Sequence, residues 1–515
     1  MPAVFDKNDS SVVVIIGSGA GGGTLAGELT KAGVNVVCLE AGKPVDSVVN
    51  DAAAMFPKLT WLDKRIGSGD LAKDFPVWSG KNVGGTTLHW TASTPRLSAR
   101  ELKPTRYFSS LSDTSVVDWP IDADEMAKYY SIAEQRMGVS GTNEWPKLPA
   151  NNHFRVLQAG AKKIGVDAHI GNMAINSVVR GDRAACMQLG FCVSGCAVQA
   201  KWTAANTPIA QAQATKHFEL RDQSFVQGIE HDKNGRVNAV IYIDNKGIQQ
   251  RQKARVVCVA ANSIDTPRIL LNSDSSHFKN GLANSAGHVG RHYIKHVFSV
   301  VSALMPHPVN FHRGTQNIGR VSAFSHSDQK RGFAGGFEFE QVSFDPATLT
   351  RLARPGRWGK NYAKQLSKYD HFAALLITGE DPAQHSNGIR LHETQKDQYG
   401  MPVPVVHYVD HPNSKKLREY AQQKAKALYQ SLGSEDVFFG PPPPATHNLG
   451  TCRMSVRPED GVSNAYGQTH DIPNLFVSDG SQFCSSGTAN PTLTIVTLAL
   501  RQADYIKQQL QQAKI

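Results

Sequence analysis

Three of the seven cysteines in this 515-residue chain fall within eleven residues of one another. Cys186, Cys192 and Cys196 have the spacing C-x5-C-x3-C in "CMQLGFCVSGC", a stretch with two glycines. A disulfide cluster would leave one of the three unpaired, and seven cysteines are too few for a disulfide scaffold in a chain of this size. Thiolates are soft ligands that select zinc or iron–sulfur centres. Zinc would need a fourth thiolate or a histidine, and no histidine lies between His169 and His217. The pattern therefore favours an iron–sulfur cluster, with three free or buried cysteines as the alternative.

A glycine-rich turn near the N-terminus separates an apolar run from a helix-like segment. "IIGSGAGGG" carries Gly17-x-Gly19-x-x-Gly22, and a second apolar run, "VNVVCLE", follows. Strand, glycine turn, helix and strand form the context of a dinucleotide-binding motif. The glycines would give a tight turn, close approach to a diphosphate and close packing of helix on sheet. Glu40, at the tip of the second strand, is predicted to accept hydrogen bonds from both ribose hydroxyls, which favours FAD or NAD over NADP. A glycine turn without a ligand is the alternative.

The far end of the chain supplies a second half of such a fold. "NLFVSDGSQFCSSGTANPTLTIVTLAL" predicts a short strand, then Asp479 and Gly480, then a loop and a helix that begins near Pro491. The acidic residue could hold the ribityl or diphosphate portion of a flavin dinucleotide. The helix N-terminus, at Pro491 and Thr492, could face the electron-rich pyrimidine end of the flavin. A fold that starts at one end of the chain and returns at the other is typical of flavoproteins.

With these two blocks, five further segments resemble the glucose-methanol-choline (GMC) oxidoreductases, in the order that family has them. They are "VGGTTLHWTASTPR" (83–96), "VDWPIDADEMAKYYSIAE" (117–134), "AANSIDTPRILL" (260–271), "VGRHYIKH" (289–296) and "THNLGTCRMS" (446–455). The resemblance is weakest from about 297 to 440. It implies an α/β fold for the FAD-binding domain, in a chain that is α+β as a whole. It also implies that the chain binds FAD and oxidises a hydroxyl by hydride transfer to flavin N5.

The resemblance also implies the domain organisation. A discontinuous Rossmann-like FAD-binding domain is expected in 1–296, which includes the cysteine loop 183–202, and again in 441–515. An antiparallel-sheet substrate domain is expected as an insertion at 297–440. Turn signals at 232–236 and 244–247 predict two hairpins in a small antiparallel unit.

Hydroxyl oxidation needs a base that removes the hydroxyl proton as the hydride leaves. Histidine titrates nearest neutrality, and His447, in "ATHNLGTCRM", occupies the place of the base in the family motif. Asn490, in "SGTANPTLT", occupies the place of the second catalytic residue, which is histidine in some members and asparagine in others. The resemblance implies that both residues contact the substrate hydroxyl.

The segment "GGTTLHW" is expected to lie against the flavin. Gly84, Gly85, Thr86 and Thr87 are predicted to line it through backbone contacts. The loop is similar to one in pyranose oxidase, a GMC relative whose histidine is bonded covalently to the flavin 8α carbon. His89 is expected to pack beside the flavin, with a covalent bond as the alternative.

The cysteine spacing resembles that of the large subunits of membrane-bound fructose dehydrogenase and FAD glucose dehydrogenase complexes. There it holds a 3Fe-4S cluster between FAD and a cytochrome c subunit. Gluconate dehydrogenase relatives carry one more cysteine, at a place that Leu189 fills here. Three thiolates fit three irons, whereas a 4Fe-4S cluster would need an outside ligand.

This resemblance implies a small partner subunit with an export signal, a cytochrome c-type acceptor, and a periplasmic location peripheral to the inner membrane, with the cytoplasm as the alternative. Residues 1–10, "MPAVFDKNDS", have neither a secretory signal pattern nor a twin-arginine motif, so a partner is expected to carry the chain.

The charge pattern argues against nucleic acid as a partner. The net charge of +11 comes from scattered residues, with no run of five or more like charges. The longest apolar runs are strand-length, so no membrane span is expected. The sequence predicts a dehydrogenase of a sugar, glycoside, sugar acid or polyol. An oxygen-using pyranose oxidase-like enzyme without a cluster and a redox-inactive flavin-binding scaffold are the alternatives. Iron content and flavin bleaching would separate the three.

Overall fold

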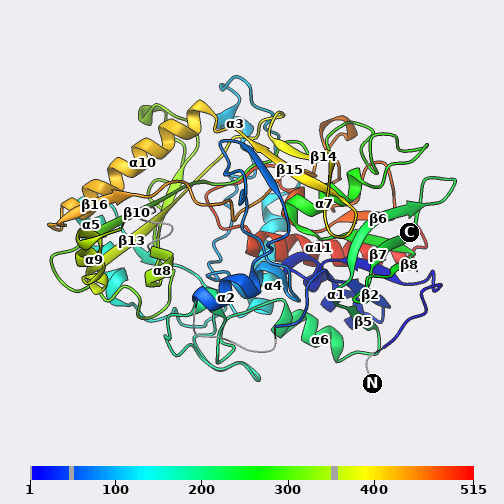
Figure 1. Ribbon diagram of the computed structural model, residues 1–515, viewed down its shortest axis with the longest axis horizontal. Helices are drawn as coiled ribbons and strands as arrows, with labels where there is room; N and C mark the ends of the chain where they lie inside the picture. The colour runs from blue at the N-terminus through cyan, green and yellow to red at the C-terminus, as the bar shows by residue number, and fades with distance from the viewer. Residues whose placement is uncertain (1–2, 46–51, 350–357) are drawn as a thin grey trace.

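The structure is a computed structural model that describes residues 3–45, 52–349 and 358–515 (Figure 1). Its strands form four sheets. A parallel sheet and an antiparallel sheet occupy the two ends of the long axis in Figure 1, and the C-terminal helix α11 (Thr492–Gln511) runs from the middle toward the end that holds the parallel sheet. No helix within the described ranges is both long and apolar enough to cross a bilayer.

The parallel sheet has five strands in the order β17-β9-β1-β2-β5. Its strands are β1 (Val13–Ile16), β2 (Val36–Leu39), β5 (Phe218–Arg221), β9 (Val256–Val259) and β17 (Leu475–Val477). Every neighbouring pair is parallel. Strands of such sheets are covered on both faces, which explains why β1, β2 and β9 are continuous apolar runs. Because β17 comes from the end of the chain, the sheet is discontinuous in sequence, as predicted.

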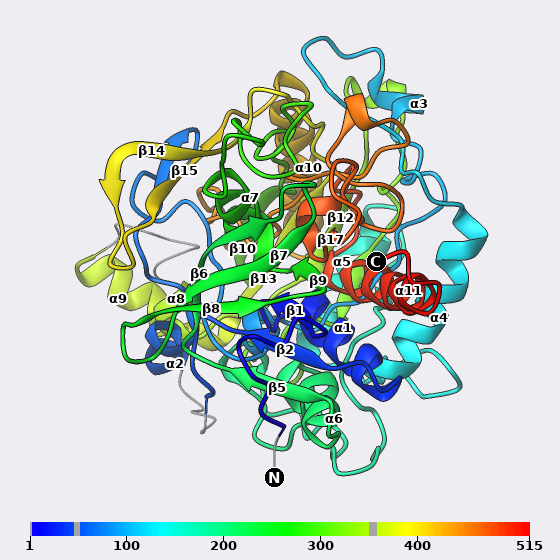
Figure 2. The same ribbon diagram turned by 90° about the vertical axis from the view of Figure 1, so that its right-hand side faces the viewer.

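Helices cover one face of this sheet, and Phe225, Val240 and Tyr242 of a small antiparallel sheet pack against the other. α1 (Ala20–Lys31) follows β1 and packs against α11, and α11 packs in turn against α4 (Ala123–Met137), as Figure 2 shows. α4 begins where Asp122 accepts hydrogen bonds from the Asp124 and Glu125 N–H groups. It ends at Gly138, whose φ of 75° favours glycine.

The antiparallel sheet has six strands in the order β16-β10-β13-β12-β11-β4. They are β4 (His169–Ile170), β10 (Val297–Leu304), β11 (Gly319–Val321), β12 (Phe337–Gln341), β13 (Phe372–Gly379) and β16 (Asp436–Phe439). All but β4 lie within 297–440, the predicted insertion. α5 (Asn152–Lys163) and α10 (Pro412–Gln430) cover one face. Side chains alternate along β12, so Phe337 and Phe339 join the core under those helices.

Two small sheets complete the fold. β3 (Ile66–Gly69) pairs in parallel with β15 (Pro402–Tyr408), which pairs with β14 (Gly388–Lys396). β6 (Phe225–His231), β7 (Val237–Ile243) and β8 (Gln249–Lys253) form an antiparallel meander, which confirms the two predicted hairpins. The remaining helices are α2 (Ala52–Leu59), α3 (Thr105–Phe108), α6 (Ala210–Gln213), α7 (Asn262–Leu271), α8 (Pro346–Thr348) and α9 (Lys360–Leu366).

Candidate active site and cysteine loop

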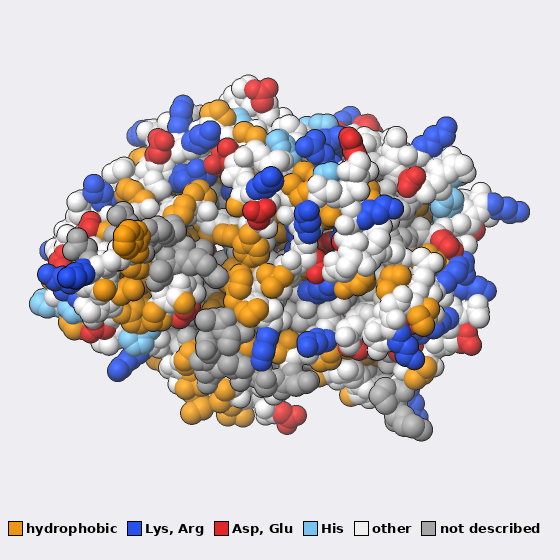
Figure 3. All heavy atoms as spheres, viewed as in Figure 1, with side chains coloured by type: hydrophobic (Ala, Val, Ile, Leu, Met, Phe, Trp, Pro, Cys, Tyr) orange, Lys and Arg blue, Asp and Glu red, His pale blue; other side chains and the backbone are white. Residues whose placement is uncertain are grey.

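A cavity of about 940 Å³ lies between the parallel and the antiparallel sheet. Most of the residues predicted to bind FAD or substrate line it: Gly17, Gly19, Glu40, Gly85, Thr86, His89, His447, Asp479, Gly480, Asn490, Pro491 and Thr492. Gly22, Gly84 and Thr87 do not. On the face drawn in Figure 3, hydrophobic side chains gather in the middle and lower left, whereas Lys and Arg are spread over the surface.

Of the three motif glycines after β1, only Gly19 has open space beside it for a ligand. Gly17 has a φ of +99°, and a Cβ there would overlap the Ala260 carbonyl oxygen. A Cβ on Gly22 would overlap the Gly17 carbonyl oxygen, so Gly22 serves helix–sheet packing and not the cavity wall. At Gly19 a Cβ would meet only the Gly85 Cα, 3.9 Å away. The backbone at Gly19 is therefore bare toward the cavity, which fits close approach of a diphosphate.

Glu40 holds the glycine turn together as well as lining the cavity. Its carboxylate accepts hydrogen bonds from Ser18 N–H (2.9 Å), Ser18 Oγ (2.7 Å) and Gly42 N–H (2.9 Å). Burial raises the pKa of Glu40, and these hydrogen bonds oppose that shift. A carboxylate has about four lone-pair sites, so Glu40 can still accept from a ribose, with fewer sites than the prediction assigned to it.

Two residues predicted to line the flavin are turned inward instead. Gly84 donates its N–H to Ser18 Oγ (3.0 Å), which ties this loop to the glycine turn. Thr87 donates its hydroxyl to the Gly84 carbonyl (2.5 Å) and accepts from Ala204 N–H (2.9 Å). Gly84 and Thr87 do not line the cavity, so their backbone contacts with a flavin stay a prediction.

His89 lines the cavity with an unused ring nitrogen. Its ring is parallel to Trp78, with centroids 5.1 Å apart. Burial, helped by the positive charge of Lys201, lowers the pKa of His89 to about 3, so the imidazole is neutral. His89 Nδ1 is buried and has no hydrogen-bond partner among the described residues. A buried, unsatisfied nitrogen fits a neighbouring cofactor atom. The covalent bond stays a prediction.

Asp479 fixes the loop after β17, which forms another part of the cavity wall. Its carboxylate accepts from Ser481 N–H (2.8 Å), Ser481 Oγ (2.5 Å) and Thr266 Oγ1 (2.5 Å). These contacts fix the loop while Asp479 and Gly480 line the cavity. α11 begins at Thr492, with Pro491 just outside it, so the positive end of this helix lies at the cavity. That end fits the electron-rich side of a flavin.

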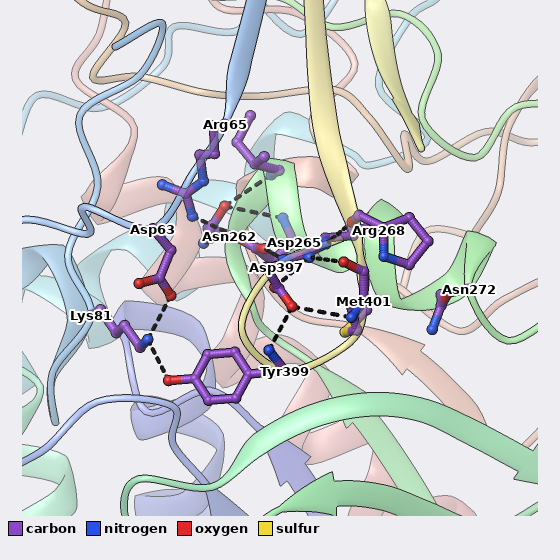
Figure 4. Close-up of polar contacts among 12 residues, drawn as sticks. Asp63, Arg65, Lys81, Asn262, Asp265, Arg268, Asn272, Asp397, Tyr399 and Met401 are labelled. Atoms are coloured by element: carbon purple, nitrogen blue, oxygen red, sulfur yellow. Dashed lines mark hydrogen bonds and ion pairs between the residues drawn. The ribbon is translucent and has the colours of Figure 1, made fainter. Parts of the chain in front are cut away.

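Asp265 and Arg268 of α7 line one end of the cavity. Ion pairs from these two residues hold the neighbouring segments in place (Figure 4). Arg65 pairs with Asp265 (2.6 Å), and Arg268 pairs with Asp397 (2.6 Å). Both pairs are buried. They join α7 to the segment before β3 and to the turn between β14 and β15.

The predicted base, His447, is half-buried beside a second histidine, His296, which is buried. His447 Nδ1 lies 2.9 Å from His296 Nδ1, so one of these atoms donates and the other accepts. Burial lowers the pKa of His447 to about 4, an effect that Arg320 adds to and Glu340 opposes. Burial also holds the pKa of His296 well below its ordinary value. Both imidazoles are therefore neutral near pH 7. His447 is thus in the form that can accept a proton.

Asn490 has fixed partners on both atoms of its amide. Its Oδ1 accepts from Ser93 Oγ (3.0 Å) and Arg320 Nη1 (2.9 Å), and its Nδ2 donates to Glu340 Oε2 (3.3 Å). These partners define which end of the amide is oxygen. Glu340 also acts electrostatically on His447, so it lies near both predicted catalytic residues.

Sequence reasoning missed the charged group behind this corner. Arg320 is buried between Glu338 (2.5 Å) and Glu340 (3.6 Å). Both glutamates lie on β12, on the side opposite Phe337 and Phe339. Charged residues that alternate with phenylalanine in "FEFEQ" were a signal that one face of this strand is not core. His296 ends the quoted motif "VGRHYIKH", yet no spacing rule connects it to His447.

The three predicted cluster ligands are free thiols, each partly buried. Burial raises the pKa of Cys192 to about 11. A hydrogen bond from Gln316 and the charge of Lys201 lower this pKa by smaller amounts, and the Cys186 and Cys196 thiols raise it slightly. In the described part of the chain, the three thiols are not among the groups placed to hold a single metal ion. The cluster stays a prediction.

The cysteine loop is fastened to the cavity wall. Val193, within the loop, lines the cavity and donates its N–H to Gln316 Oε1 (2.9 Å), and Gln316 lines the cavity too. Buried Lys201 donates to the carbonyls of Leu88 (2.8 Å), Trp90 (3.1 Å) and Cys192 (2.5 Å). One ammonium group therefore joins the cysteine loop to the segment that carries His89.

Comparisons with known proteins agree with this geometry. Sequence profiles described as GMC oxidoreductase match residues 8–298 and 383–499. The chain is 32% identical to a 2-methyl-1,2-propanediol dehydrogenase of Mycolicibacterium austroafricanum, over 97% of this chain and 95% of that protein. It is 26% identical to the fructose dehydrogenase large subunit of Gluconobacter japonicus, over 98% and 99%. The fold is similar to that of formate oxidase from Aspergillus oryzae, with a TM-score of 0.71, 15% identity and coverage of 98% and 99%. The chain belongs to the GMC oxidoreductases, flavoproteins that act on alcohol CH–OH groups with FAD.

Proposed function

We propose that this chain is an FAD-dependent dehydrogenase of a sugar, glycoside, sugar acid or polyol. Its electrons would leave through a 3Fe-4S cluster held by Cys186, Cys192 and Cys196 to a cytochrome c-type acceptor. The observation that carries the proposal is that the cysteine loop, through Val193, forms part of the wall of the cavity that His447 and Asn490 line. When bound, FAD supplies a hydride acceptor at N5 and the cluster supplies a one-electron carrier. The names of the two relatives, a diol dehydrogenase and a fructose dehydrogenase subunit, support the substrate class.

His447 is assigned as the base, and its neighbour sets its tautomer. If His447 Nδ1–H donates to His296 Nδ1, the proton on His296 is at Nε2 and His447 Nε2 is left with its lone pair. That lone pair can take the hydroxyl proton as the carbon loses its hydride. His296 is thus a positioning residue, because it keeps the base in the competent tautomer and touches no reacting atom.

Asn490 is assigned to orient the same hydroxyl. With Oδ1 occupied by Arg320 and Ser93, only its Nδ2 group is available as a donor. One N–H of that group goes to Glu340. The other can donate to the hydroxyl oxygen of the substrate, which directs the hydroxyl proton away from Asn490.

The surface around the cysteine loop suits a protein partner. Exposed apolar side chains gather in sequence around it: Met187 is 63% exposed, Leu189 45% and Val179 69%. Val178 and Phe191 are exposed as well. Apolar side chains gathered on a surface mark interaction sites. We propose that a small subunit or a cytochrome c-type acceptor covers this surface, and that the complex is periplasmic and peripheral to the inner membrane.

The test is an anaerobic assay of the isolated protein for iron and for substrate. The proposal predicts about three irons per flavin and flavin bleaching by at least one of a panel of sugars, glycosides, sugar acids and polyols. Bleaching without iron would instead indicate an oxidase. Iron with no bleaching by any compound would contradict the proposed activity, and neither property would indicate a flavin-binding scaffold.

A further inference from the structure

Three histidines that do not line the cavity come together near the surface. Along the chain, His288 and His292 come after α7 and before β10, and His385 comes after β13 and before β14. One ring nitrogen of each lies within 4.8 Å of the others. The ring centroids of His288 and His292 are 5.0 Å apart, and those of His292 and His385 are 5.2 Å apart. Neither FAD nor the proposed cluster accounts for these side chains.

We propose that His288, His292 and His385 form a binding site for a divalent late transition-metal ion, with zinc as the representative ion. Neutral imidazole is the ligand that zinc, copper and nickel share. With a zinc–nitrogen bond of about 2.0–2.1 Å, ligand nitrogens of a tetrahedral site lie about 3.3 Å apart. The closest pair here, His288 Nδ1 and His292 Nε2, is 2.8 Å apart. Movements below the size of an atom would therefore convert the cluster into a three-ligand site.

Two of the rings have behind them the hydrogen-bond partners of metal-bound histidines. His288 Nε2 lies 2.7 Å from the Glu459 carbonyl oxygen, so this nitrogen carries the proton and Nδ1 presents its lone pair to the cluster. Because His288 Nδ1 is an acceptor, His292 Nε2 donates to it and His292 Nδ1 accepts from Ser115 Oγ (2.8 Å). A metal ion bound at Nε2 would shift the His292 proton to Nδ1, where Ser115 Oγ can accept it. A metal-binding histidine usually donates its other N–H to such an acceptor. Both partners are already in place.

The third ligand is held less tightly but lies in a fixed segment. Ala383, two residues before His385, accepts a hydrogen bond from Ser115 N–H (2.7 Å). Ser115 therefore ties the His385 segment to His292. Because His385 is exposed and His292 is buried, the fourth position of the metal would face solvent and take water.

Neighbouring charges set the protonation state of the cluster. Burial, followed by the positive charge of Arg291, lowers the pKa of His385, and burial with Arg453 lowers that of His292. Both rings are therefore neutral at pH 7, as ligands must be. The same arginines repel a cation, which Asp460 beside Arg453 offsets in part.

Isothermal titration of the flavin-loaded protein with zinc tests the site. The unsubstituted chain should bind one more zinc ion than His385→Ala, or bind it at least tenfold more tightly, and His288→Ala should show the same loss. His307→Ala, at an exposed histidine outside the cluster, is the matched control and should titrate as the unsubstituted chain does. Zinc should also raise the thermal midpoint of the unsubstituted chain and not that of His385→Ala.

Thiols are the main competitors for zinc, so Cys192→Ser is titrated in parallel. Loss of zinc binding in Cys192→Ser with full binding in His385→Ala and His288→Ala would overturn the proposal. Identical titrations of the unsubstituted chain and both histidine variants would overturn it as well. Neither result depends on which hydroxyl compound the enzyme oxidises, so the proposed function is tested separately.

Discussion

The two functional regions of this chain are built in opposite ways. Around His447, the polar side chains of Asn490, Arg320 and Glu340 are buried and held by hydrogen bonds, and Arg320 anchors the group by charge. The cysteine loop has half-buried thiols, a short 3-10 turn and exposed apolar neighbours. A site that removes a proton from a hydroxyl and a hydride from the carbon that bears it needs fixed geometry. A site that passes electrons to another protein needs access to the surface. Under the proposed function, the two halves of the reaction belong to separate regions that share one cavity wall.

The largest effect is expected at the base. His447→Ala should slow anaerobic flavin reduction by at least a hundredfold, since general base catalysis contributes about 10²–10⁴. FAD should stay bound, because the glycine turn and Glu40 are untouched. Stopped-flow bleaching measures the rate, with His307→Ala as the surface control. Unchanged reduction would remove His447 as the base.

The next effect concerns the stability of the buried corner. Arg320→Met leaves Glu338 and Glu340 buried without their cation, and breaking such a buried pair costs about 3–5 kcal/mol. The matched control is Lys368→Met, which breaks the exposed pair with Glu435 (2.8 Å) and should cost no more than about 1 kcal/mol. Denaturant unfolding of the two variants gives both values. Equal losses would show that Arg320 does not anchor the corner.

A smaller effect is expected from pH. The pKa of His447 is lowered to about 4 in the folded chain, whereas the unfolded value is about 6.5. The unfolded state therefore takes up the proton first as pH falls, and folding stability is lost between these two values. The loss should be on the order of 2 kcal/mol between pH 6.5 and 5. Unfolding curves of the flavin-loaded protein and of His447→Gln measure it. An equal loss in both would contradict the lowered pKa.

The smallest effect on flavin reduction is expected from a change in the cysteine loop, and it tests most sharply whether the two regions act separately. Cys192→Ser should leave the rate of flavin reduction by substrate within about twofold, because the thiol touches neither His447 nor Asn490. The same variant should lose the cluster and transfer electrons slowly to an external acceptor. Paired measurements of the two half-reactions check this. A large loss of flavin reduction would mean that the two regions are not separable.

The parts of the fold that follow local rules could be predicted from the sequence. The glycine turn, the apolar parallel strands, the hairpins at 232–236 and 244–247 and the helix after Pro491 are all encoded within short segments. The partners of the site residues are not. Arg320 and Asn490 are 170 positions apart, and the segment around Arg320 carries no motif of the family. The sequence likewise does not show that Gly84 binds Ser18 Oγ and that the Thr87 hydroxyl binds Ala204 N–H, away from the cavity lining.

Low-temperature EPR tests most directly the proposed electron path from the His447 corner to the cysteine loop. The protein is isolated without oxygen and frozen before and after a substrate bleaches the flavin. The signal of an oxidised 3Fe-4S cluster should be present before the substrate is added and should disappear as the flavin is reduced and passes electrons on. Absence of any cluster signal in the isolated protein, or a signal that persists unchanged beside a bleached flavin, would contradict an electron path from the His447 corner through the cysteine loop.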